Sequence, residues 1–175
     1  MENEQQGRCQ CKKISYSFEH SKLISAHHCH CKDCQRATGS GKATIMIVPK
    51  KYLKLEGELK YFEVKCSSGS HIRRGFCEHC GSGILSYAKE VPHILYIKAG
   101  TLDDSSWLKI DSNFFTDSSH DWNKPSEAPK SFKRNPTMSS NFITLLKSFK
   151  YMLPSHLLSQ LNCLQHLLTT RALLE

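Results

Sequence analysis

The spacing of cysteines constrains this chain more than any other feature of its sequence. Two of the nine cysteines, Cys66 and Cys163, stand alone. The others fall into three close groups, Cys9-x-Cys11, Cys29-x-Cys31-x-x-Cys34 and Cys77-x-x-Cys80. Cysteines one residue apart are poorly placed to bridge each other, and their total is odd. The pattern therefore favours thiolates that hold metal ions over disulfides.

The stretch FCEHCG, residues 76–81, has the mechanics of a zinc knuckle. Its two thiolates sit on a tight turn, and Gly81 permits the backbone conformation that the turn needs. Tetrahedral zinc needs four ligands, so the other pair comes either from Cys9 and Cys11 or from two members of the 29–34 cluster. In the most economical partition, one zinc ion is held by Cys9, Cys11, Cys77 and Cys80. A second ion is then held by Cys29, Cys31 and Cys34, with its fourth position open.

Closed zinc sites are structural, and sites with an open position are catalytic. The four-cysteine site would tie the N-terminal segment to the knuckle and so stabilise a small domain. The fourth position of the other site has several candidate ligands, namely Cys66, His27, His28, His30 and His79. In an extended segment His28 and His30 alternate with the cysteines and point away from the metal. The spacing of the cysteines does not indicate an iron–sulfur cluster.

Short stretches with alternating or continuous apolar residues predict a mainly β domain of short antiparallel strands. These stretches are KISYSFE, KATIMIVP, LKYFEVK, GILSYA and HILYIKAG, and turn residues separate them. A short apolar piece at residues 113–116 is a candidate edge strand. Pro125, Pro129 and Pro136 indicate the end of the compact domain, which we therefore place at residues 1–136.

Residues 137–175 form a leucine-rich extension. Leu157, Leu161, Leu164 and Leu168 follow steps of four, three and four, which predicts an amphipathic C-terminal helix. Such a helix could mediate oligomerisation or membrane-surface binding, or it could pack on its own domain. We favour packing on its own domain.

The formal net charge of +8 is consistent with an anionic partner or with a merely basic surface. Because no run of Lys and Arg exceeds two residues, we favour the basic surface. The polar start MENEQQGRC and the lack of any run of about 18 apolar residues predict neither a signal peptide nor a membrane span. We expect a cytoplasmic location, with a nuclear one as the alternative.

Four motifs together resemble the glutathione-dependent formaldehyde-activating enzyme family, which also contains centromere protein V. They are GRCQC, CHCKDCQRATGS, RRGFCEHCGSGI and IKAGTLDD. The resemblance covers residues 7 to about 136, although FFTDSSHDWNK fits the family pattern only loosely. It implies a β-tent fold with two zinc ions, one structural on Cys9, Cys11, Cys77 and Cys80 and one catalytic on Cys29, Cys31 and Cys34. It also implies carbon–sulfur lyase activity that joins formaldehyde to glutathione, giving S-hydroxymethylglutathione.

A zinc ion with three thiolates is a weak Lewis acid that suits a fourth sulfur ligand better than a hydroxide. The bound thiolate of glutathione, the co-substrate, would add to an aldehyde carbon. Lys32, Arg36 and Lys42 are candidates to offset the negative charge and to meet the carboxylates of glutathione. Gly39 and Ser40 are candidates for a loop that offers backbone N–H donors.

The alternative function is a zinc scaffold without catalysis that binds nucleic acid or protein. The sequence lacks the interleaved aromatic and basic residues that are typical of single-strand binders. We therefore favour the enzyme, with a small thiol and an aldehyde as its partners.

Overall fold

The computed structural model of the chain describes residues 3–66, 69–126 and 130–134. This part is mainly β, with a single α-helix, α1 (Lys32–Thr38). The predicted C-terminal helix and the proposed boundary at residue 137 lie outside the described residues. The predicted mainly β class is confirmed for the described part.

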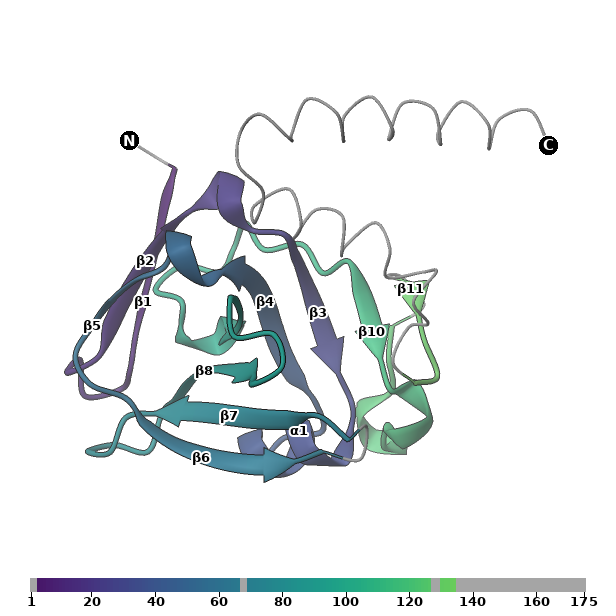
Figure 1. Cartoon of the computed structure of the whole chain (residues 1–175). Coiled ribbons are helices and arrows are strands. Elements are labelled where there is room, and N and C mark those ends of the chain that lie inside the picture. Colours follow the sequence, from purple (N-terminus) through teal and green to yellow (C-terminus); the bar gives the residue numbers. More distant parts are fainter. Residues whose placement is uncertain (1–2, 67–68, 127–129, 135–175) are drawn as a thin grey trace, which may run out of the picture. The chain divides into compact units, whose positions relative to one another are not determined.

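The strands form two sheets (Figure 1). The smaller sheet has the order β1-β2-β5, with bounds β1 Glu4–Arg8, β2 Ser15–Glu19 and β5 Lys54–Glu56. The larger one has the order β11-β10-β3-β4-β9-β8-β7-β6. Its strands are β3 Ser25–Cys29, β4 Ala43–Pro49, β6 Lys60–Lys65, β7 His71–Phe76, β8 Gly83–Ala88, β9 Ile94–Lys98, β10 Ser112–Phe114 and β11 Lys130–Ser131.

Strand β10 corrects two details of the sequence prediction. It pairs in parallel with both β3 and β11, whereas all other strand pairs are antiparallel as expected. It is also not an edge strand, because β11 covers its free side. The chain reaches β10 from a long connection after β9, and Asp111 anchors its start by accepting the Ala26 N–H and donating its own N–H to the Ala26 carbonyl. A chain that enters beside the start of β3 can only run parallel to it.

The larger sheet buries one face in the hydrophobic core. Met46 of β4 lies opposite Ala26 and Ile97, and Ile97 lies opposite Leu85 of β8. This row packs with Tyr16 and Phe18 of the smaller sheet in one buried cluster. Because side chains alternate along a strand, the residues between these core positions point to the opposite face of the sheet.

Truncating the centre of this row should destabilise the domain. Met46 is 0% exposed, so we expect Met46→Ala to lower the free energy of unfolding by about 2–5 kcal/mol. Phe62→Ala is the control, because Phe62 is 62% exposed on the outermost strand β6 and should change that free energy by about 0.5 kcal/mol or less. Chemical unfolding of both variants checks the difference, and equal effects would contradict this assignment of the core.

Candidate metal centres and active site

The structure brings together the four cysteines that the sequence analysis assigned to the structural site. The sulfur atoms of Cys9, Cys11, Cys77 and Cys80 all lie within 4.8 Å of one another. The Cys9 and Cys11 sulfurs are 3.5 Å apart, and those of Cys11 and Cys77 are 3.6 Å apart. Cys9 and Cys77 are buried in the core cluster. Residues 66 positions or more apart in sequence therefore meet in a compact sulfur group.

Local backbone geometry explains why this group forms. The turn after β7 is closed by the Gly81 N–H, which donates to the Cys77 carbonyl, and Gly81 has a φ of +73°. The Cys80 sulfur lies 3.2 Å from the Ser82 hydroxyl. Hydrogen bonds with the side chain and backbone of Ser82, and then with Cys11, lower the pKa of the Cys80 thiol to about 5. On the other segment, the Ile14 N–H donates to the Cys9 sulfur at 3.3 Å. Such donors stabilise thiolates, which is the form that binds a metal.

The second group contains Cys29, Cys31 and Cys34, whose sulfurs also lie within 4.8 Å of one another. Cys29 ends β3, and Cys31 is the N-cap of α1, where its sulfur accepts the Cys34 N–H at 3.4 Å. The Cys29 and Cys31 sulfurs are 3.5 Å apart. A strand end followed at once by a helix start thus places all three sulfurs on one side of the chain.

None of the candidates for a fourth ligand joins the three sulfurs within 4.8 Å, although Cys66 lines a cavity beside them. His27 bonds to the hydroxyls of Ser25 and Ser112, and His28 to the hydroxyl of Thr44. His30 is fully buried, and this burial is the main cause that lowers the pKa of its ring. Among the described residues, no further histidine, cysteine or carboxylate joins the three-cysteine group at the same separation.

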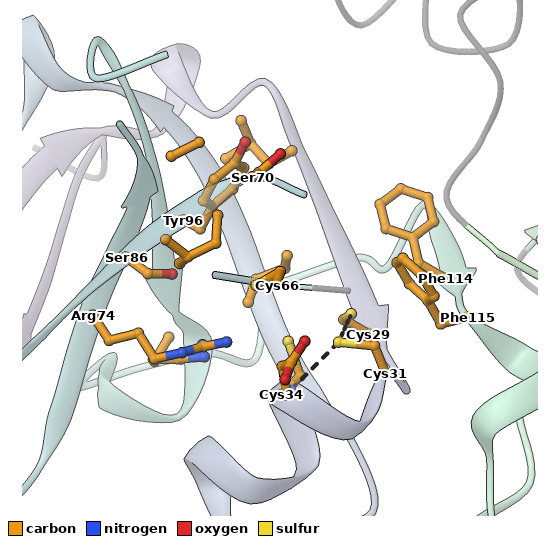
Figure 2. Close-up of a pocket in the computed structure, with 16 residues that line it drawn as sticks. Cys29, Cys31, Cys34, Cys66, Ser70, Arg74, Ser86, Tyr96, Phe114 and Phe115 are labelled. Atoms are coloured by element: carbon orange, nitrogen blue, oxygen red, sulfur yellow. Dashed lines mark hydrogen bonds between the residues drawn. The ribbon is translucent and has the colours of Figure 1, made fainter. Parts of the chain in front are cut away.

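A cavity of about 220 Å³ opens beside the three cysteines. Figure 2 shows Arg74 extending toward Cys34, with Phe114 and Phe115 on the other side of the cysteine group. The apolar part of the lining consists of Ile45, Ile47, Ile72, Ala88, Phe114 and Phe115. The polar part, apart from the three cysteines, consists of Asp33, Cys66, Ser70, Arg74, Ser86, Tyr96 and Lys98.

The wall of this cavity is the face of the larger sheet that points away from the core. Arg74, Ser86 and Tyr96 lie opposite one another across β7, β8 and β9. Lys98 follows Tyr96 by two residues on β9 and therefore shares its face. One sheet thus supplies the core with one face and this cavity with the other.

Two cations act on the three-cysteine group. Hydrogen bonds from Cys29 and Cys31 are the main cause that lowers the pKa of the Cys34 thiol, and the charges of Lys98 and Arg74 lower it further. Burial lowers the pKa of Lys98, while the nearby Cys34 thiolate opposes this effect. The Lys98 Nζ is buried and has no hydrogen-bond acceptor among the described residues.

The predicted glutathione contacts are placed differently from the cavity lining. Lys32 donates to Gln35 at 3.2 Å, and Gly39 caps the end of α1 with a φ of +63°. Arg36 and Ser40 are exposed on and just after the same helix. In the described part of the chain, none of these four residues lines the cavity. Sequence reasoning missed Lys98 and Tyr96, although their alternation with apolar residues in HILYIKAG was a usable signal.

Both cysteine groups fit zinc by the chemistry of their donors. Four clustered sulfurs match a closed tetrahedral site, and three sulfurs beside a cavity match a site that accepts an external ligand. Soft thiolate donors favour zinc over hard cations such as Mg²⁺ or Ca²⁺. Among the described residues, no helix is long and apolar enough to cross a bilayer.

Comparison with known proteins identifies a family for the chain. A search of curated proteins finds no match. Among solved structures, the chain is similar to the crystal structure of a Rhodobacter sphaeroides protein, with 18% identity and a TM-score of 0.46. That match covers 58% of this chain and 91% of the other. The model of the family described as "Glutathione-dependent formaldehyde-activating enzyme" matches residues 4–118, which include all seven clustered cysteines. The chain therefore belongs to the glutathione-dependent formaldehyde-activating enzyme family.

Proposed function

We propose that the protein is a zinc enzyme that forms and cleaves the carbon–sulfur bond of S-hydroxymethylglutathione, a lyase-type reaction. The observation that carries this proposal is the group of Cys29, Cys31 and Cys34 beside a cavity with two cationic side chains. Family membership supports glutathione and formaldehyde as the reactants. The cavity of about 220 Å³ suits the reacting end of the thiol and the one-carbon aldehyde, with the remainder of the peptide outside.

Cys29, Cys31 and Cys34 would hold the catalytic zinc, and Cys9, Cys11, Cys77 and Cys80 the structural zinc. A zinc ion on three thiolates supplies a soft position at which a thiol binds as its thiolate at neutral pH. The three cysteines orient this thiolate toward the cavity, where the aldehyde carbon is held within reach. The apolar side chains of Ile45 and Ile47 reduce the access of water to the reacting atoms.

Negative charge accumulates at the proposed catalytic site and has to be offset by nearby cations. Zinc with three thiolates carries a net charge near −1, and a fourth thiolate makes it more negative. Asp33 adds another negative side chain to the cavity lining. Lys98 and Arg74 line the same cavity as the three cysteines, and their positive charges would offset this negative charge.

The proposed function also suggests a division of the chain into two parts. We propose residues 1–136 as the zinc domain and residues 137–175 as a separate leucine-rich extension. We propose a cytoplasmic location, where glutathione keeps thiols reduced.

Titration of the metal environment with glutathione tests the function. We expect two zinc ions per chain, and a rise from about 3.5 to about 4 sulfur ligands per zinc when glutathione is added. X-ray absorption at the zinc edge measures this number. Nuclear magnetic resonance exchange spectroscopy should show faster interconversion of formaldehyde and S-hydroxymethylglutathione with the enzyme than without it.

A scaffold without catalysis gives the opposite result. Its zinc coordination stays constant when glutathione is added, and the exchange rate remains that of the spontaneous reaction. S-methylglutathione is the matched control ligand, because its thioether cannot form a thiolate. It should leave the sulfur count unchanged even when glutathione raises it.

A further inference from the structure

We propose that Lys98 is a catalytic residue whose ammonium group holds the negative oxygen that forms when a thiolate adds to the aldehyde. This inference rests on the proposed function, and it adds the group that stabilises the reacting oxygen.

The position of Lys98 is the first support for this role. Lys98 is the last residue of β9 and faces the cavity, opposite Ile45 of β4. Its Nζ is buried and has no acceptor among the described residues. Ammonium groups are strongly hydrated, and burial without a partner is unfavourable unless another acceptor is supplied. A ligand oxygen in the cavity would supply that acceptor.

The surroundings of Lys98 are the second support. Among the charged groups that oppose the effect of burial on Lys98, the Cys34 thiolate is the strongest, and Cys29 and Cys31 contribute as well. The geometry agrees, because Lys98 and the three cysteines line the same cavity. Lys98 lies opposite Ile45 of β4, two residues from Ala43, which lies opposite Cys29 of β3. An oxygen two bonds away from a bound sulfur falls in this same region.

Other cations of the site are less suited to this role. Lys32 is exposed, and its Nζ already contacts Gln35, His120 and the Ser118 carbonyl. Arg74 comes from β7, separated from β9 by β8, and its planar group suits a carboxylate better than a single oxygen. We therefore assign the reacting oxygen to Lys98 and leave Arg74 free to bind a carboxylate of the peptide.

The chemistry balances without a further reactant. The sulfur electron pair forms the new bond to the formaldehyde carbon, and the π pair of the carbonyl moves to its oxygen. The resulting alkoxide accepts hydrogen bonds from the Lys98 ammonium group and then takes a proton from water. The thiol lost one proton when it became a thiolate, so the net reaction is addition of the S–H bond across the carbonyl. Cleavage follows the same steps in reverse.

A pair of small thiols measures this role without turnover. Thioglycolate carries its negative oxygens three bonds from its sulfur, one bond further than the reacting oxygen. Mercaptoacetamide is its neutral counterpart with the same shape. A charge-assisted hydrogen bond from Lys98 should make the zinc-loaded protein bind thioglycolate about 10- to 100-fold more tightly than mercaptoacetamide. Calorimetric titration gives both dissociation constants for the full chain.

Lys98→Met should reduce this preference to about 1- to 3-fold while the affinity for mercaptoacetamide stays unchanged. Its kcat for the exchange reaction should fall by about 10²- to 10³-fold, with little change in KM for glutathione. Lys98→Gln keeps a donor without the charge and should also lose most of the preference. Lys109→Met is the matched control, because Lys109 is exposed outside the cavity, and it should behave as the wild type.

The outcomes separate this inference from the proposed function. If the wild type binds both thiols and Lys98→Met keeps the preference for thioglycolate, Lys98 does not hold the oxygen. If the wild type binds both thiols with equal affinity, the inference also fails while the thiol site stands. If it binds neither, the proposed function itself is wrong.

Discussion

Cys80→Ala is expected to unfold the domain and to release the zinc ion of the four-cysteine group. Structural zinc contributes about 10–16 kcal/mol of apparent binding free energy, which is of the same size as the whole stability of a typical domain, about 5–15 kcal/mol. Cys9 and Cys77 of this group belong to the buried core, so its loss exposes core residues as well. Circular dichroism should show loss of the β signal at 25 °C, and metal analysis should show fewer than two zinc ions per chain.

Cys66→Ala is the matched control for this experiment. Cys66 lines the cavity but belongs to neither sulfur group, and it is half-buried just after β6. The variant should keep its metal content and its melting temperature within a few degrees of the wild type. A Cys80→Ala protein that folds normally with two zinc ions would show that the four-cysteine group is not the structural centre. Loss of zinc from Cys66→Ala would instead identify Cys66 as a ligand.

Local patterns predicted much of this fold because they report on single strands and single turns. The alternation in KISYSFE corresponds to β2, in which Tyr16 and Phe18 are buried. GILSYA corresponds to β8 without an error at either end. The spacing of Cys77 and Cys80 with Gly81 indicated the tight turn, and the same arithmetic selected Cys9 and Cys11 as its partners. The strands and the turn depend on neighbours in sequence, whereas the pairing of the two distant cysteine segments was inferred from the four ligands that zinc needs.

Long-range features were not predictable in the same way. The parallel pairing of β10 depends on Asp111 reaching Ala26, a contact between segments that share no sequence pattern. Helix α1 is only seven residues long and lacks a full apolar periodicity, so no helix was expected after the cysteine cluster. The residues predicted to bind glutathione were chosen because they are near the cysteines in sequence. The cations that actually line the cavity come from β7 and β9, which are adjacent to the cysteines only in space.

Cys31→Ser is expected to abolish thiol binding and enzymatic turnover while the domain stays folded. The substitution removes one of three sulfurs from the proposed catalytic zinc, so this ion should be lost and the metal content should fall from two to about one per chain. Serine is a favourable N-cap residue, so α1 keeps the cap that the Cys31 sulfur provides by accepting the Cys34 N–H. The free energy of unfolding should therefore change by about 1 kcal/mol or less relative to the wild type protein from which only the catalytic zinc has been removed.

Cys31→Ala separates the cap from the metal ligand. Both variants should lack glutathione binding by calorimetry, but the alanine variant should be less stable than the serine variant by about 0.5–2 kcal/mol because the cap is lost. The decisive comparison is with Cys80→Ala, which removes a sulfur from the buried four-cysteine group. If Cys31→Ser unfolds the domain as completely as Cys80→Ala, both sulfur groups maintain the fold and the division into a structural and a catalytic site is wrong. If it binds glutathione as the wild type does, the thiol binds elsewhere, because a site built by three cysteines cannot retain its affinity after losing one of them.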